Sequence, residues 1–480
     1  MTYRFIVYSA TLALLSGCAG FMPPIQVPMV VAPNWHAPLP HQGSVASLSD
    51  WWQRQGDPLL VELIGAAQAV SPSVAQALAR IESTRANQAA ANAALIPNVS
   101  AQASASRGVS QANAPLETTL QGGLQASWEL DLVGANRAVS NAAQAQLEGS
   151  QAQWHDARVS VAAEVANLYY SLRSCKQQLS VNQRDAASRQ QTARVTAVSA
   201  QAGFLAPAVA AMARASAADA NSRLTQQTAA CALDTKALVA LSGMPEPLLE
   251  QKLALVLVLP AQLTMFSIAS VPAQMVSQRP DVFAAERDVV LASAQVGSAK
   301  AQQWPRLSLN GSIGAMRVST GPNTTSASTW SFGPLAVSLP LFDGGQRAAN
   351  VQSAQASYQS VVVAYQGKVR HAVREVEEAL VNLQSTQARA IDAQVATQAY
   401  AESMSATQHR FAQGLANLFE LEDTRRSALA AESALLALHL ERQRAWVALY
   451  RAVGGGFEPD KLAQVSTATH TITPNTTAQP

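Results

Sequence analysis

Four segments of the chain alternate between apolar and polar residues, the pattern of strands that have one apolar and one polar face. They cover residues 99–106, 120–132, 307–315 and 330–341. The fourth segment changes face at Gly333-Pro334, which a β-bulge would explain. About ten residues of strand are enough to cross a membrane, although a strand of a soluble sandwich would alternate in the same way.

Long helical segments surround these strands. A helix at 74–95 or 282–303 precedes each pair and ends before a proline, which cannot continue it. A helical run at 136–201 or 346–412 follows each pair and is on the order of 100 Å long. Gly203 and Gly414 break these runs, and a second helix returns. In the last helix, apolar residues follow a heptad, which predicts long antiparallel coiled-coil hairpins. The heptad residues are Leu421, Ala428, Leu435 and Leu449 on one line and Ala431, Leu438, Ala445 and Ala452 on the other.

The same unit occurs twice along the chain. The segment that begins Ser71-Pro72 returns as Arg279-Pro280, and Gly203 returns as Gly414. The register between the copies changes in one place, within a stretch between residues 107 and 120 that is rich in Gly, Pro, Ser and Asn. A single localised insertion is typical of a duplicated structural unit whose hairpin loop tolerates it.

Four membrane strands cannot close a barrel, because open edges in lipid leave backbone groups unsatisfied. The smallest natural barrels have about eight strands, so the chain is expected to pool its strands with copies of itself. Two copies would give eight strands and a filled interior, whereas three would give twelve and room for a water-filled lumen. These considerations do not choose between the two.

The first residues of the chain are typical of a lipoprotein signal. Arg4 precedes an apolar run that is too short to span a bilayer as a helix, and Leu15-Ser16-Gly17-Cys18 then matches a lipobox. We expect cleavage before Cys18 and acylation of Cys18 with diacylglycerol and an N-acyl chain. An ordinary secretory peptide with a chance cysteine is the alternative. Ala19 gives no signal for retention at the inner membrane, so we expect a cell outer-membrane location.

The expected organisation runs from a signal peptide at 1–17 and a lipid-anchored segment at 18–70 to a first repeat at 71–243. An inter-repeat segment at 244–279, a second repeat at 280–456 and a C-terminal segment or disordered tail at 457–480 follow. The fold class is mainly α, with a β-barrel membrane part.

Composition excludes several kinds of function. The formal net charge is only +2 and no Lys/Arg run occurs, so nothing suggests a nucleic-acid partner. No metal-ligand spacing, nucleophile motif or cofactor motif is present, and we expect neither enzyme activity, nor a metal site, nor a cofactor apart from the lipid. Glu375, Glu377 and Glu378 cluster on a helix, where a solvated coiled-coil face is the simpler explanation than acid/base chemistry.

The combined features resemble the outer-membrane efflux proteins of the TolC/OprM/NodT family. The lipobox, the duplicated unit, the phrase Trp128-Glu129-Leu130-Asp131-Leu132, the phrase 339–345 (LPLFDGG) and the closing 452–456 (AVGGG) carry the resemblance. It implies a homotrimer with a twelve-stranded barrel and a long periplasmic extension, an α-helical tunnel. The segments at 18–70, 244–279 and 457–480 would then form a belt around that tunnel. The resemblance also implies a tripartite efflux system with a periplasmic adaptor protein and an inner-membrane transporter of the RND type, in which the chain itself conducts drugs or other small toxic compounds passively.

The same resemblance suggests a periplasmic gate at the turn of the second hairpin. Glu420 and Asp423 match the family's acidic entrance ring, which in a trimer would attract cations and repel anions. Phe411 stands where the best-known member has Tyr, and Ala416 where it has a latching Arg. We expect Arg410 or Arg426 to replace that Arg. The apolar first tip at 202–207, around Gly203, is either an adaptor-docking edge, as the tip around Gly414 would be, or ordinary packing.

Cys175 and Cys231 lie 28 residues before and after Gly203. If Gly203 is near the apex of the hairpin, two antiparallel helices bring both thiols to the same height. An exported protein meets an oxidising compartment, so we expect a disulfide between them, with two reduced, packed cysteines as the alternative.

Two further functions remain open at this stage. A coiled-coil lipoprotein could space the outer membrane from the cell wall, but a spacer has no need for four amphipathic strands. Within transport, metal-ion efflux or type I secretion is the alternative to an RND-type drug efflux system.

Overall fold

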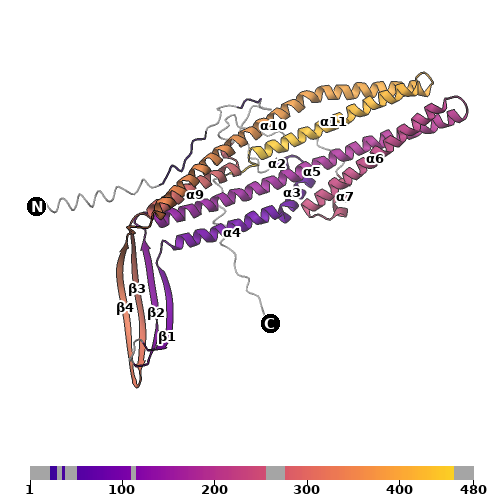
Figure 1. The fold of residues 1–480 in the computed structure, drawn as a ribbon. Helices are drawn as coiled ribbons and strands as arrows, with labels where there is room; N and C mark the ends of the chain where they lie inside the picture. Colours follow the sequence, from indigo (N-terminus) through magenta and orange to yellow (C-terminus); the bar gives the residue numbers. More distant parts are fainter. Residues whose placement is uncertain (1–21, 30–34, 38–50, 110–114, 256–275, 459–480) are drawn as a thin grey trace. The chain divides into compact units, whose positions relative to one another are not determined.

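The structure is a computed structural model and describes residues 22–29, 35–37, 51–109, 115–255 and 276–458. The chain forms two compact units, which are described separately below. Figure 1 labels the helices and strands. The first unit consists of residues 1–30, 77–153 and 281–368. The second unit consists of residues 31–76, 154–280 and 369–480.

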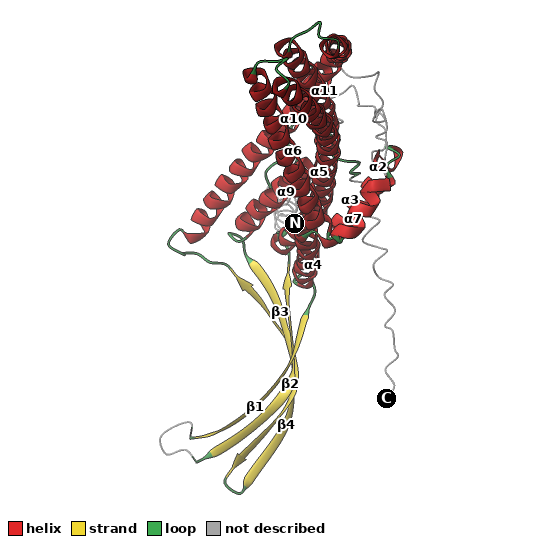
Figure 2. Cartoon of the chain, turned by 90° about the vertical axis from the view of Figure 1, so that its right-hand side faces the viewer, coloured by secondary structure: helices red, strands yellow, loops and turns green. Residues whose placement is uncertain are grey.

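The first unit contains one four-stranded antiparallel sheet in the order β1-β2-β3-β4, seen as a twisted ribbon of strands in Figure 2. The strands are β1 (Asn98–Gly108), β2 (Glu117–Leu130), β3 (Arg306–Thr320) and β4 (Asn323–Ser338). Each copy of the repeat supplies one hairpin, and β2 pairs with β3 to join the copies. The four predicted strands are therefore confirmed. All four extend further at their hairpin ends than the alternation indicated, whereas β2 and β4 stop before the predicted ends at 132 and 341.

The irregularity predicted in the fourth strand is confirmed. Leu309 pairs with Leu335 while Gly311 pairs with Phe332, so two residues of β4, Gly333 and Pro334, face one residue of β3. This bulge restores the apolar residues of β4 to a single face of the sheet.

The helices closely follow the expected segments. Helices α4 (Pro72–Ala93) and α9 (Pro280–Ala301) begin and end about two residues earlier than expected. Each starts with a proline in its first turn, where the missing N–H costs nothing. The long helices α5 (Ala135–Gln201) and α10 (Gln346–Ala412) have 67 residues each, and α6 (Pro207–Ser242) and α11 (Leu418–Ala452) return beside them in the second unit (Figure 1).

The second unit also contains the short helices α2 (Trp51–Arg54), α3 (Pro58–Val70) and α7 (Glu246–Leu255). Asp57 caps α3 and also accepts hydrogen bonds from the Tyr169 hydroxyl, at 2.7 Å, and the Arg173 guanidinium, at 2.8 Å. The Trp51 ring stacks on Tyr450, with centroids 4.9 Å apart. These contacts fasten the segment around 51–70 to α5 and α11.

The end of α11 meets the beginning of the second repeat. Gly454 has φ 90°, and a Cβ there would collide with the backbone of Gln278. Arg279 donates to the carbonyl oxygen of Ala452 at 2.9 Å and pairs with Glu375 at 2.7 Å. Glycine in the closing phrase is thus required by a close backbone approach.

Within the described ranges, no single helix is both long and apolar enough to cross a membrane, whereas α3 and α4 together meet that test as a pair bent by 53°.

Candidate functional site: the tips of the helical hairpins

The turn between α10 and α11 is built by local sequence signals. Gly414, two residues after the end of α10, adopts φ 77°, a left-handed conformation that favours glycine. Asn417 caps α11, because its side chain accepts a hydrogen bond from the backbone N–H of Glu420 at 2.9 Å. Glu420 therefore lies in the first turn of α11, where the helix dipole favours a negative charge.

The four charged residues predicted for the gate form two exposed pairs. Arg410 contacts Glu420 at 2.6 Å and also donates to the carbonyl oxygen of Leu415 at 3.1 Å. Arg426 lies 3.9 Å from Asp423. Both pairs lie within the second hairpin, so in the part of the chain that the structure describes neither arginine bridges the two hairpins. Exposed pairs of this kind contribute about 0–1 kcal/mol.

Phe411 belongs to a small apolar cluster that joins the hairpins. Leu418 and Leu421 of α11 are buried against Ala213 of α6. Phe411 is partly buried and packs against this cluster, together with Ala193, Val209 and Met212.

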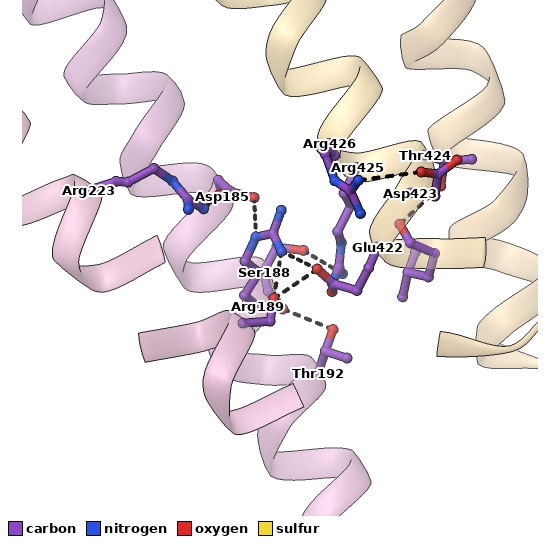
Figure 3. Close-up of polar contacts among 12 residues, drawn as sticks. Asp185, Ser188, Arg189, Thr192, Arg223, Glu422, Asp423, Thr424, Arg425 and Arg426 are labelled. Carbon is purple, nitrogen blue, oxygen red and sulfur yellow. Dashed lines mark hydrogen bonds and ion pairs between the residues drawn. The ribbon is translucent and has the colours of Figure 1, made fainter. Parts of the chain in front are cut away.

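Next to this cluster, beginning at Glu422 of α11, a buried network of charges connects α11 to the first hairpin (Figure 3). One carboxylate oxygen of Glu422 accepts hydrogen bonds from Arg189 of α5 and from Ser216 of α6, the latter at 2.8 Å. Its other oxygen accepts from Arg425 at 3.0 Å. Arg425 in turn donates to the hydroxyl of Ser188 on α5 at 2.9 Å. Three helices therefore meet on one carboxylate.

A second carboxylate completes the network. Asp185 accepts from Arg189 at 2.8 Å and from Arg223 of α6 at 3.2 Å (Figure 3). The side chains of Arg189, Glu422 and Arg425 are only 9 %, 10 % and 3 % exposed. Burial lowers the pKa of the Arg425 guanidinium, whereas the charge of Glu422 raises it. The carboxylates of Asp185 and Glu422 thus offset the cost of burying the charges of Arg189 and Arg425.

Sequence reasoning missed this network. It selected Glu420 and Asp423, which are exposed, and passed over Glu422 between them. A signal was present, since Asp185 and Arg189 are four residues apart and Glu422 and Arg425 three apart, spacings that place opposite charges on one helix face.

A disulfide joins Cys175 of α5 to Cys231 of α6, the pairing expected from their distances to Gly203, and the two Cα atoms are 5.5 Å apart. Gln227 packs beside it and donates to the carbonyl oxygen of Cys175 at 3.4 Å. The bond holds α5 and α6 together within the first hairpin. The corresponding positions of the second hairpin, Thr386 and Arg442, cannot form one.

Both tips expose apolar side chains. At the first tip, where Gly203 has φ 80°, Phe204 is 83 % exposed. At the second tip, Leu415 and Phe419 are 66 % and 69 % exposed. Exposed apolar groups gathered at two tips are typical of a protein-binding surface.

The remaining predicted residues lie elsewhere. Cys18 is outside the described residues. Glu377 accepts hydrogen bonds from the backbone N–H groups of His36 and Ala37, at 2.7 and 2.8 Å, and Glu375 pairs with Arg279, so these carboxylates make structural contacts. Within the described ranges, no group of His, Cys, Asp or Glu is arranged to hold a metal ion.

Comparisons with known proteins agree on one family. The family described as "Outer membrane efflux protein" matches residues 63–244 and 271–455, once for each repeat. Outer membrane protein OprJ of Pseudomonas aeruginosa is 28 % identical over 476 residues, covering 95 % of this chain and 96 % of that protein. Nodulation protein T of Rhizobium leguminosarum bv. trifolii is 27 % identical, covering 93 % and 96 %.

Solved channels have the same fold. The Neisseria gonorrhoeae MtrE outer membrane channel, described in an open state, superposes with a TM-score of 0.75 at 26 % identity, covering 91 % of this chain and 98 % of that one. VceC of Vibrio cholerae superposes with a TM-score of 0.73 at 26 % identity, covering 85 % and 99 %. The match extends over both repeats, the sheet and the helical hairpins, and the chain belongs to the outer membrane efflux protein family.

Proposed function

We propose that this outer-membrane efflux channel works as a homotrimer whose twelve strands close one barrel and whose helical hairpins line one periplasmic tunnel. The observation that carries the proposal is the open sheet. Strands β1 and β4 each pair on one side only within the described chain, and unpaired backbone groups at membrane depth are too costly to leave exposed. Three copies of four strands leave a lumen wide enough for water, whereas two copies fill it.

The duct is one part of a tripartite system in this proposal. A periplasmic adaptor contacts the exposed apolar residues at the hairpin tips, and an inner-membrane transporter, of the RND type, energises the cargo. Relatives in Pseudomonas putida are named as outer membrane proteins of solvent and toluene efflux pumps. These names support small toxic compounds as the cargo of this chain, which conducts them passively and catalyses no reaction.

Lipid on Cys18 anchors each protomer in the proposal. The lipobox supports it, because more than one acyl chain gives firm membrane attachment where a single chain is marginal. Mass spectrometry of the mature N-terminus is the test, and an unmodified start at any other residue would contradict it. Cys18→Ser should impair processing while the barrel itself still holds the protein in the membrane.

The trimeric duct is tested on the purified, detergent-solubilised protein. Native mass spectrometry should give three chains per particle, and the same sample should form ion-conducting channels in a planar bilayer. A stable monomer or dimer, or a trimer that never conducts, would refute the proposal. Loss of efflux when the gene is deleted, restored by the wild-type chain, tests the cellular role.

A further inference from the structure

The sheet segregates its charged residues by face. Consecutive residues of a strand point to opposite faces, and residues paired across antiparallel strands point to the same face. Leu120, Leu124 and Trp128 define an apolar face, which in the proposed barrel is turned toward lipid. Across the sheet this face continues through Ile313 of β3 and Trp330 of β4, which pair with each other.

Two arginines lie on this lipid-facing side. Arg317 pairs with Leu120, and Arg107 pairs with Thr118, which is two residues from Leu120 and hence on the same face. By contrast, Arg306 pairs with Ser338 and lies on the opposite, lumen-facing side. The described strands contain acidic residues only at Glu117 and Glu129, and both alternate with Leu120 onto the lumen-facing side. The lipid-facing side is therefore purely cationic.

Both arginines lie at one end of the apolar face. Arg107 is the last residue but one of β1, and Arg317 is three residues before the end of β3. These are the hairpin ends, whereas the opposite strand ends lead into the helices. In an outer-membrane channel with periplasmic helices, the hairpin ends reach the outer leaflet. Arginine on the lipid face is costly at the bilayer midplane and nearly neutral close to the interface, which agrees with this placement.

The two side chains are close enough to act on one ligand. Residues paired across neighbouring strands form a row that runs across the sheet. Arg107 pairs with Thr118, which pairs with Ser319, so Arg107 and Ser319 lie in one row, two strand spacings apart. Arg317 lies two residues from Ser319 along β3, in the next row on the same face. Standard sheet dimensions then give about 12 Å between the Cα atoms of the arginines. Within the described part of the chain, neither guanidinium has a hydrogen bond or ion pair, so both remain available.

Small side chains make the adjoining face hollow. The row next to Arg317 toward the middle of the sheet carries no side chain larger than that of serine, and these residues line a shallow depression together with Leu120 and Arg317. The row consists of Ala103, Gly122, Ala315 and Ser328. An acyl chain would fit such a depression directly below a charged headgroup.

We propose that Arg107 and Arg317 form a binding site for the phosphorylated glycolipid of the outer leaflet, lipopolysaccharide. The guanidinium groups hold the phosphates of its lipid A headgroup, because arginine binds phosphate through paired hydrogen bonds as well as charge. An acyl chain lies in the depression beside Leu120. The site rests on the proposed membrane barrel, and a trimer carries three such sites around its outer rim.

The test uses intact trimers purified in mild detergent, with bound lipid extracted and quantified by mass spectrometry. Wild-type protein should retain lipid A, and the double variant Arg107→Gln/Arg317→Gln should retain at least tenfold less. The double variant Arg107→Lys/Arg317→Lys should keep a large part of the binding, because lysine still supplies positive charge. Arg306→Gln is the matched control, since it removes a basic residue of β3 from the opposite face, and it should bind as the wild type does.

A second experiment needs no variant. Delipidated wild-type trimer in nanodiscs is titrated with lipid A, with dephosphorylated lipid A and with phosphatidylglycerol. Only intact lipid A should bind tightly. Equal binding of the dephosphorylated form or of phosphatidylglycerol, or unchanged retention in the glutamine variant, would overturn the proposed site.

Conductance of the same samples separates this site from the proposed function. A conducting trimer without phosphate-dependent lipid binding contradicts only the lipid site. A wild-type chain that neither trimerises nor conducts would overturn both.

Discussion

Replacement of Glu422 with glutamine should release the second hairpin from the first. The carboxylate of Glu422 accepts hydrogen bonds from Arg189, Ser216 and Arg425, and thereby joins α11 to α5 and α6. Glutamine keeps the volume of the side chain but removes its charge. Two buried arginines would then share a site with less negative charge than they need.

The expected size of the effect follows from burial. Removal of one partner from a buried ion pair costs about 3–5 kcal/mol, because the other charge stays buried without compensation. Arg189 still contacts Asp185 at 2.8 Å in the variant, so the lower end of that range applies. A loss of about 3 kcal/mol raises the fraction of open hairpins roughly 100-fold.

Amide hydrogen exchange of the trimer measures this opening. Backbone amides in the first turns of α11 should exchange roughly 100-fold faster in Glu422→Gln, and the time-averaged conductance of single channels should rise. Amides beside the Cys175–Cys231 disulfide should be unaffected. Glu420→Gln is the matched control: its partner Arg410 is exposed, and a loss of about 0–1 kcal/mol gives less than a tenfold change.

Equal acceleration in the two variants would refute the reasoning, because it would mean that burial of the network adds nothing to the attachment of α11. No change in either variant would show that the apolar cluster around Leu421 alone holds the hairpins together.

Three further predictions concern other parts of the second unit. Glu420→Ala/Asp423→Ala should reduce the preference of the channel for cations, and an unaltered cation preference in bilayer recordings would contradict the acidic ring. Denatured, unreduced protein should show no reactive thiol at Cys175 or Cys231, and reduction should destabilise the first hairpin by up to about 4 kcal/mol; two labelled thiols per chain would contradict the bond. Burial, reinforced by the charge of Arg158, lowers the pKa of His155 to about 4 from 6.5, so the neutral form is favoured in the fold. The contribution of His155 to the free energy of unfolding should be fully present above pH 6.5. That free energy should fall by up to about 3 kcal/mol as the pH drops toward 4. A His155→Phe variant should lose this pH dependence in thermal unfolding, whereas unchanged dependence would assign it to another group.

The sequence by itself determined the repeating units and their elements. Local periodicity predicts the helix lengths and the strand alternation. The positions of Gly and Pro predict the element ends and the bulge at Gly333-Pro334, because these residues act through backbone geometry within a few residues. The pairing of Cys175 with Cys231 also followed from distances along the chain, because an antiparallel hairpin converts equal distances from its apex into equal heights.

Only the tertiary structure decided which charges are buried. Glu420, Glu422 and Asp423 lie in one short stretch, and charge spacing does not show which of them is buried. Glu422 has an arginine three residues further on, and so has the exposed Asp423. Glu422 is buried because it faces Arg189 and Ser216, which are more than 200 residues away along the chain. The exposed Glu420 instead forms an ion pair with Arg410 of its own hairpin, 10 residues away along the chain. Burial and pairing depend on which helix faces come together in space, and the heptad indicates only that a face is covered, without indicating what covers it.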